Sequence, residues 1–320
     1  MIPTPSRQAT KVLSEAVKRA SRLGFGRIGT ENLLISLANS RGPGRKLDVQ
    51  SLLPQAMARG TTHWFGDDGG VAEPGRDVMA LIHTAHHHAG VETLLPVSGA
   101  LDRCLSTALA EAGDDVLTTT HLALALLSLD SALSAELMTL RYVDAEATAR
   151  AVRAACEPEE SPAMWLMHKT GALEGETGGG YVNWLTKLIV RGRGLGSPVL
   201  TIVRHEAERH AVAAGREDPT ARDLVAAVLS IDHQLAKAGK RLKPEFASRG
   251  AEILRDAGVD VAALPVVSTG ADVDRAIEGA KLTAVRRGDE VVGTEHLLLA
   301  LRDDPFDPLR GALAGLGAET

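Results

Sequence analysis

The sequence predicts an all-α protein built from two helical domains, and three observations lead to this. Four segments share one pattern of two successive helices, and no part of the chain alternates apolar and polar residues over several strands. Hydrophobic residues make up 44% of the sequence, yet only 3% are aromatic, so the core must consist mostly of Ala, Leu and Val. A length of 320 residues is enough for two domains of ordinary size.

The composition excludes several classes of protein. A net charge of −6 argues against a general nucleic-acid binder. Cys104 and Cys156 are the only cysteines and form no CxxC pair, which excludes a disulfide framework and a cysteine-rich zinc site. No apolar run reaches the ~18 residues of a membrane span, and the first residues lack the apolar region of a signal peptide. We therefore expect a cytoplasmic protein without a membrane span.

The repeated pattern is clearest in two segments that align without a gap, and two weaker copies fit the same frame. The strong copies are Leu13–Leu37 and Ile277–Leu301. The weaker copies are Leu101–Leu127 and Val203–Leu229. Four occurrences of one pattern indicate a duplicated helical unit.

Each copy begins with an amphipathic helix that has apolar residues at about every fourth position. Ala16 and Ala20, one turn apart in the first copy, permit close packing against another helix. A glycine at the same place in each copy is expected to end this helix at the C′ position: Gly24, Gly113, Gly215 and Gly288.

The second helix of each copy is expected to start at a threonine that caps it. The threonines are Thr30, Thr119 and Thr294, with Thr220 one position earlier in the frame. The residues that follow are nearly all apolar, so this helix is expected to be short and buried.

Further helices are expected after these pairs. Residues 134–142 and 144–156 follow the second copy, with Asp144 as a cap, and residues 244–260 form one helix that ends at Gly258. Residues 307–320 form a last helix, so the fourth copy lacks most of its fourth helix. The first copy carries a Gly- and Asp-rich insertion around residues 60–75.

The spacing of the copies predicts the domain boundaries. The first domain is expected at residues 1–156, with repeats at about 5–95 and 97–156. Residues 157–198 begin with EPEESP and contain GETGGG, so they are expected to be a linker with a short amphipathic helix. The second domain is expected at 199–320, with repeats at about 199–266 and 269–320.

The segments RLGFGRIGTENLL and GDEVVGTEHLLLAL resemble the repeat of the amino-terminal domain of Clp-type AAA+ chaperones. In that family two repeats of four helices form one domain with pseudo-twofold symmetry, so the resemblance implies two such domains in tandem, the last repeat truncated. The family's domain is not an enzyme. It binds adaptors, substrate segments and, in some members, phosphoarginine, and in actinobacterial-type members it is the target of cyclic peptide antibiotics.

The sequence has neither the GxxxxGK[ST] loop of an ATPase nor the GxSxG of a serine hydrolase. The resemblance therefore implies a non-enzymatic protein that binds peptides or degradation tags. It could act as a stand-alone sequestering or decoy module that protects Clp from cyclic peptide antibiotics, or as an adaptor that docks on a Clp ATPase–protease. No cofactor is expected.

The resemblance also implies a binding site. Glu31 and Glu295 match the family's glutamate that contacts the guanidinium of phosphoarginine, and a carboxylate suits that planar donor. Thr30 and Thr294 precede them, and Ser6 aligns with a family threonine beside the site. The alternative is that each glutamate only favours the dipole of its own helix.

Two other groups of residues are candidates. In the linker, Tyr181 and Trp184 precede several basic residues and could dock a partner or a membrane surface, or could pack between the domains. His83 and His87 are four residues apart in a run of histidines and could bind a metal, or could stabilise the end of a helix.

The segment from His205 to His210 is similar to the HExxH motif of zinc proteases but has one residue too many. A five-residue spacing places the two histidines about 140° apart around a helix, so they cannot bind one zinc ion. We therefore expect neither a metal nor catalysis at this segment.

Overall fold

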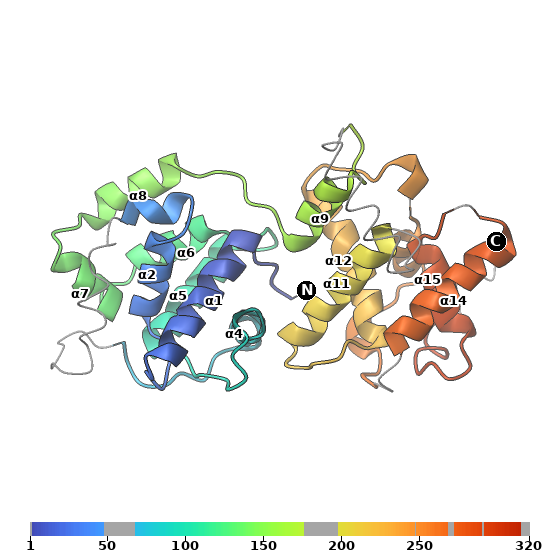
Figure 1. Cartoon of the computed structure of the whole chain (residues 1–320), viewed down its shortest axis with the longest axis horizontal. Coiled ribbons are helices and arrows are strands. Elements are labelled where there is room, and N and C mark those ends of the chain that lie inside the picture. Colours follow the sequence, from blue (N-terminus) through green and yellow to red (C-terminus); the bar gives the residue numbers. More distant parts are fainter. Residues whose placement is uncertain are drawn as a thin grey trace. The chain divides into compact units, whose positions relative to one another are not determined.

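The computed structural model describes residues 2–47, 68–175, 198–246, 248–267, 272–289 and 291–314, and it forms two compact units, Ile2–Ser161 and Pro162–Thr320 (Figure 1). In these ranges the regular structure is helical, and extended pairing is confined to isolated β-bridges. The predicted all-α class is confirmed. None of the described helices is long and apolar enough to cross a membrane.

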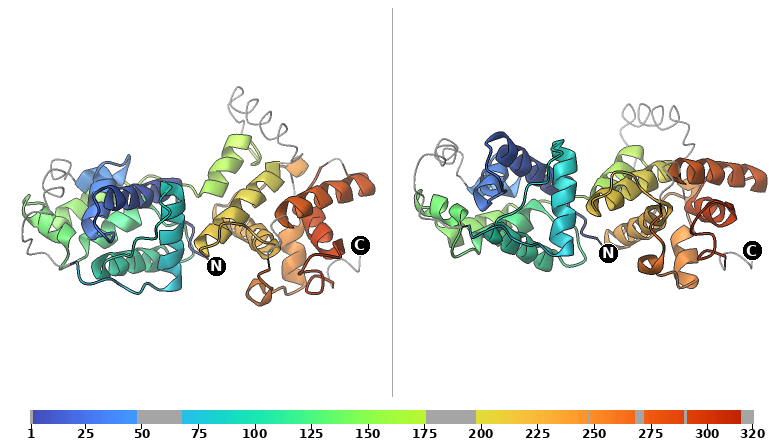
Figure 2. Two further views of the ribbon diagram at one scale, coloured as in Figure 1. Left: turned by 60° about the horizontal axis from the view of Figure 1, so that its bottom comes forward. Right: turned by 90° about the horizontal axis from the view of Figure 1, so that it is seen from below.

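The first unit has its own hydrophobic core, to which all of its described helices contribute; Figures 1 and 2 show how these helices are arranged. Its elements are α1 (Arg7–Arg22), α2 (Thr30–Ala38), η1 (Pro43–Leu47), α4 (Arg76–Ala89), α5 (Gly99–Ala112), α6 (Thr119–Leu127), α7 (Leu133–Thr139) and α8 (Ala145–Ala154). Helix α2 is buried along its whole length, as the apolar sequence predicts.

The second unit has a separate core. Its elements are α9 (Pro162–Thr170), α11 (Pro198–Ala213), α12 (Ala221–Lys237), η4 (Pro244–Phe246), α13 (Gly250–Asp256), η5 (Val261–Ala263), α14 (Asp272–Arg287) and α15 (Thr294–Asp303). Helix α9 falls inside the segment 157–198 that we expected to be a linker, but its residues Met164 and Met167 are buried in this core. The second unit therefore begins at residue 162, earlier than the predicted 199.

The expected glycines are confirmed as helix terminators. Gly24, Gly113, Gly215 and Gly288 all have positive φ angles, between 57° and 75°. Such angles are accessible to glycine without the steric penalty that a side chain brings.

The expected caps are displaced by one residue in three of the four copies. The N-caps of α2, α6, α12 and α15 are Gly29, Thr118, Thr220 and Gly293, each five residues after its glycine. Thr30, Thr119 and Thr294 instead occupy the first helical position, where their side chains bond to other segments rather than to their own helix. Thr220 stands one position earlier than the other three threonines when the four copies are aligned. Its predicted role as an N-cap is correct.

Other expected helices were only partly right. Asp144 caps α8 as predicted and accepts a hydrogen bond from the amide of Ala147 at 2.9 Å. The single helix expected over 244–260 is interrupted, with η4 and α13 as separate elements. Residues 307–314 form turns, so the helix expected at 307–320 is not present in its described part.

The two halves of the first unit correspond only in part. Helix α1 packs on α2 as α5 packs on α6, and α2 contacts α7 as α6 contacts η1. The last helices differ: α4 packs along α1, whereas α8 packs against α6 and η1 (Figure 2). The predicted symmetry of two four-helix repeats therefore remains a prediction.

A substitution at Gly44 tests the close contact between η1 and the end of α2. A Cβ at this position would lie 2.5 Å from the Leu37 carbonyl oxygen, which is part of the backbone and cannot easily move. We expect Gly44→Ala to lower the free energy of unfolding by about 1–3 kcal/mol, as other overpacked sites do. Urea denaturation measures this. Gly70→Ala is the matched control, because nothing lies within 4 Å of a Cβ there; equal midpoints for the two variants would contradict the packing described.

Candidate functional site

Two helix N-termini in the first unit are bound by carboxylates that come from distant parts of the chain. The first amides of a helix have no hydrogen-bond partner within the helix, and the helix dipole favours a negative charge beside them. Glycine caps α2 and offers no side chain for this purpose. Asp68 supplies the carboxylate at α2, and Glu159 supplies it at α6.

The Asp68 carboxylate is fully buried and joins three helices. One oxygen accepts from the amide of Thr30 at 2.7 Å and from the Ser98 hydroxyl at 2.8 Å. The other accepts from the Thr30 hydroxyl at 2.6 Å and from the amide of Leu133 at 2.9 Å. Four donors satisfy this charge, which is what allows a carboxylate to stay in the interior.

Glu159 is a half-buried residue, whereas Asp68 is fully buried. The Glu159 carboxylate oxygens accept from the amide of Thr119 at 3.1 and 3.2 Å and from the hydroxyls of Thr119 and Ser6. Ser6 and Thr119 are both buried completely, so their donors form a fixed, preorganised set around the carboxylate. We call this set of donors the Glu159 seat.

Backbone pairing places these two groups of donors in matching positions. The Ser6 amide donates to the Leu117 carbonyl at 2.8 Å, and the Ser98 amide donates to the Ile28 carbonyl at 2.9 Å. Ser6 and Ser98 are the N-caps of α1 and α5. Each carboxylate thus meets one serine that caps a first helix and one threonine that begins a second helix.

The structure places the predicted ligand-binding residues in different surroundings. Ser6 and Thr30 belong to the two groups of donors just described. Glu31 is 2% exposed and folds back over its own helix, where one oxygen accepts from the side-chain amide of Asn32 at 2.6 Å. A Cβ on Gly29 would overlap this carboxylate, so a larger residue there would require the Glu31 side chain to move.

In the second unit the start of α15 is capped by a hydroxyl rather than by a carboxylate. The Thr294 amide donates to the Ser248 hydroxyl at 2.7 Å, and the Thr294 hydroxyl accepts from the Gly250 amide at 3.0 Å. The Glu295 side chain, 25% exposed, accepts from the Arg249 amide at 3.1 Å. Of the two predicted glutamates, Glu295 is therefore the one that solvent reaches.

The sequence did not single out Asp68, Ser98 or Glu159. Ser98 could have been found as an N-cap, because it directly precedes the amphipathic pattern of the second copy. The two carboxylates carry no local signal, since their partners lie 30 to 153 residues away. Tyr181 and Trp184, the predicted partner-binding residues, lie outside the described residues.

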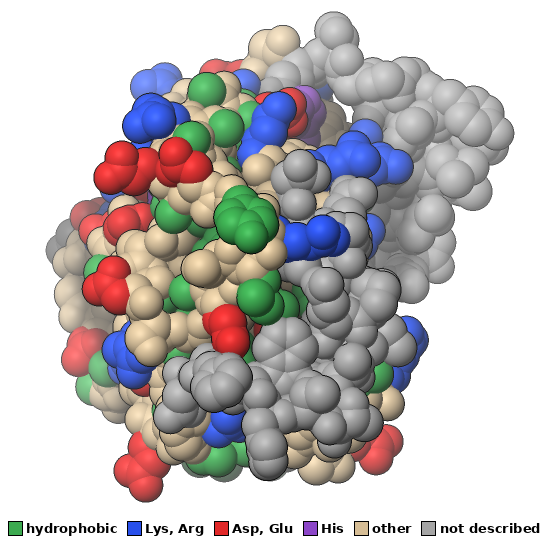
Figure 3. Space-filling model, turned by 90° about the vertical axis from the view of Figure 1, so that its left-hand side faces the viewer, with side chains coloured by type: hydrophobic (Ala, Val, Ile, Leu, Met, Phe, Trp, Pro, Cys, Tyr) green, Lys and Arg blue, Asp and Glu red, His purple; other side chains and the backbone are tan. Residues whose placement is uncertain are grey.

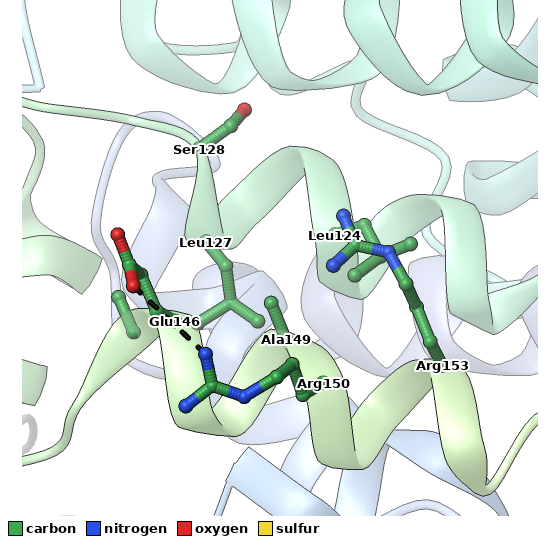
Figure 4. A pocket seen from close by; sticks show the side chains of 8 residues that line it. Leu124, Leu127, Ser128, Glu146, Ala149, Arg150 and Arg153 are labelled. Atoms are coloured by element: carbon green, nitrogen blue, oxygen red, sulfur yellow. Dashed lines mark ion pairs between the residues drawn. The ribbon is translucent and has the colours of Figure 1, made fainter.

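A shallow recess between α6 and α8 has a volume of about 380 Å³ (Figure 4). Leu124, Leu127 and Ala149 form its apolar wall, and Arg150 pairs with Glu146 at 3.9 Å on its rim. On the face drawn in Figure 3, acidic and basic side chains are interspersed among small, separate apolar patches. The recess can hold an apolar side chain, but its rim has no unbalanced charge except Arg153.

The histidine run at the end of α4 has a structural role at one position. The His86 ring is buried, with Nδ1 2.8 Å from the Ile82 carbonyl oxygen and Nε2 accepting from the Leu95 amide at 2.9 Å. Burial lowers the pKa of His86. The expectation of a solvated helix end is therefore wrong for this ring. Among the described residues no three His, Cys, Asp or Glu side chains are grouped as a metal site would need.

The segment from His205 to His210 contributes a buried polar cluster between α11 and α12. Arg209 donates to the Glu206 carboxylate at 2.6 and 3.0 Å, and Ser230 donates to it at 2.6 Å. Burial alone would raise the pKa of Glu206, but the charge and hydrogen bonds of Arg209 lower it to about 2. Burial, together with the charge of Arg209, lowers the pKa of His210 to about 4.

Comparison with family models, curated proteins and solved structures finds no match for this chain. Its function is therefore argued from the residues themselves.

Asp68→Asn tests the buried carboxylate. The amide keeps one acceptor oxygen but turns an NH₂ group toward two of the four donors, so two hydrogen bonds to a charged group are lost. We expect the free energy of unfolding to fall by about 2–3 kcal/mol in urea denaturation. Asp114→Asn, which changes the same charge at an exposed site, is the control. An equal effect of the two substitutions would show that Asp68 does not join the three helices in solution.

The lowered pKa of His210 predicts how the stability of the protein depends on pH. Because its pKa in the folded protein, about 4, is below the usual 6.5, the unfolded chain takes up the proton first as pH falls. Stability should therefore decline between pH 6.5 and 4, by roughly 3 kcal/mol at most. His210→Gln should make this decline smaller, with the rest due to groups such as His86, and His233→Gln on α12 should leave it unchanged. Unfolding midpoints measured across this range would contradict the assignment if His210→Gln kept the full slope.

Proposed function

We propose that this chain is a non-enzymatic binding protein that recognises an anionic group on a peptide or degradation tag, with phosphoarginine as the test case. The observation that supports the proposal is the Glu159 seat, the set of donors that Ser6 and Thr119 direct at the Glu159 carboxylate. One amide and two buried hydroxyls converge there on the carboxylate of a residue that is only half-buried. An external anion could take the same donors.

We assign a different role to the Asp68 carboxylate and its four donors. The carboxylate is completely buried and bonds three helices, so its replacement by an external group would require the first unit to open. We therefore assign Asp68 to stability and the Glu159 seat to binding.

The glutamates suggested by the Clp resemblance are divided in the same way. Glu31 contacts Asn32 inside the unit and is assigned to holding the turn. Glu295 is partly exposed and is assigned to the second unit as an acceptor for a guanidinium group, with Thr294 and Ser248 beside it.

The proposal includes the way in which the protein would act. Since the chain resembles the Clp amino-terminal domain without its ATPase, we propose a stand-alone module that sequesters such tags and, by the same resemblance, cyclic peptides directed at Clp. The alternative is an adaptor that docks on a Clp ATPase–protease. The two differ in one respect: only an adaptor forms a stable complex with the purified ring, and size-exclusion chromatography of the mixture distinguishes them.

The binding test is calorimetric titration of the full chain with phosphoarginine. Glu159→Gln removes the charge that competes for the seat, so we expect it to tighten binding on the order of tenfold. Thr119→Val removes a donor and should weaken binding. Glu157→Gln lies in the same segment, is exposed and serves as the matched control.

Two results would count against the proposal. The first is the absence of binding stronger than about 1 mM in both the native chain and Glu159→Gln. The second is an equal change in affinity for Glu157→Gln and Glu159→Gln, which would indicate a general effect of charge rather than competition for the seat.

A further inference from the structure

A larger groove in the first unit lies between one face of α1 and the end of α2. Its volume is about 650 Å³, within the range of ~300–1,000 Å³ that small-molecule sites occupy. Residues three or four positions apart on α1 form one wall, and Ser36 of α2 with the turn after it forms the other. Neither Ser6 nor Thr119 lines it, so it is distinct from the Glu159 seat.

The groove is strongly basic. Four cationic side chains line it, and Glu15 is the one acidic side chain among the lining residues. Glu15 already pairs with Lys18 at 3.2 Å, outside the groove. Lys11, Arg19 and Arg41 form no ion pair with a described residue. Glu15 also attracts Arg19. With four cations against one carboxylate, this concave surface carries an excess of positive charge and attracts an anion.

Two residues that line the groove each have a buried donor without a hydrogen-bond partner among the described residues. The Ser36 hydroxyl is buried, with the residue only 4% exposed, and the Arg19 Nε is buried as well. Buried donors of this kind are rare in native proteins and need an explanation such as a bound group. Both lack an acceptor, and both belong to residues that line the same groove.

The lining restricts the chemistry of the ligand. It contains no aromatic ring on which a nucleobase could stack, and Val12 is its only aliphatic residue. The remaining surface consists of side-chain amides, hydroxyls, cations and the one carboxylate of Glu15. An apolar ligand or a nucleobase would find little to contact, whereas a polar molecule with concentrated negative charge fits.

We propose that this groove binds the phosphate monoester group of a polar molecule. The buried donors of Arg19 and Ser36 hydrogen-bond the phosphate oxygens, and the exposed cations Arg7, Lys11 and Arg41 neutralise its charge. A monoester carries nearly two negative charges and three acceptor oxygens near neutral pH, which matches these donors. The proposal is independent of the function proposed above, since the two sites use different residues.

The experiment is calorimetric titration of the full chain with glucose 6-phosphate and with N-acetylphosphoserine amide, each beside its unphosphorylated counterpart. We expect one monoester bound per chain and no binding of the counterparts. Arg19→Met should weaken binding at least about tenfold. Arg22→Met is the matched control, because it removes the same charge from the same helix outside the groove. Ser36→Ala, which changes no charge, should weaken binding several-fold and keeps the test valid if Arg19→Met does not fold.

The two monoesters represent two sources of the same group, a free metabolite and a phosphorylated protein. The tighter of them identifies the source, and either order supports the site. Affinity should also rise from pH 5 to 7 as the second phosphate proton is lost, near pH 6. Binding weaker than about 1 mM for both monoesters, or equal affinities for Arg19→Met and Arg22→Met, would overturn the proposal.

Discussion

The first unit depends on one buried charge, the carboxylate of Asp68. It receives four hydrogen bonds, two from Thr30 and one each from Ser98 and Leu133, and so fixes the starts of α2, α5 and α7 against each other. Because α2 has a glycine cap, nothing else nearby satisfies its first amide. The apolar helices could pack in several registers, but a buried charge tolerates only the arrangement that brings all of its donors together.

The same arrangement of donors holds Glu159, which is less enclosed than Asp68. Both carboxylates meet a capping serine and a threonine at the first position of a helix, yet one lies in the interior and the other reaches solvent. The two residues differ in how deeply they are buried rather than in the type of donor that binds them. We therefore assign the fully enclosed carboxylate to stability and propose the less enclosed one as the place where an external anion binds.

The sequence predicted what is local and periodic. The glycines that end the first helices, Asp144 as a cap and the buried second helices follow from a few neighbouring residues, and the structure has them. The caps were misplaced because threonine is a good cap in isolation, while here Thr30 and Thr119 serve distant carboxylates. We did not predict helix α9, because its short apolar segment lies between Gly- and Glu-rich residues that are typical of a linker. The carboxylate seats could not be predicted, since pairing across 38 or 153 residues leaves no spacing to detect.

The position of Glu159 also determines how long the connection between the two units is. Its carboxylate is held by the first unit, and the next residue, Glu160, accepts a hydrogen bond from the Arg7 amide at 3.2 Å. Only Ser161 then separates the anchored chain from the start of α9. If an anion displaces Glu159, the segment that precedes α9 loses one of its attachments to the first unit, while Glu160 keeps its hydrogen bond with the Arg7 amide. Occupancy of a small site would thereby change how firmly the residues between α8 and α9 are held.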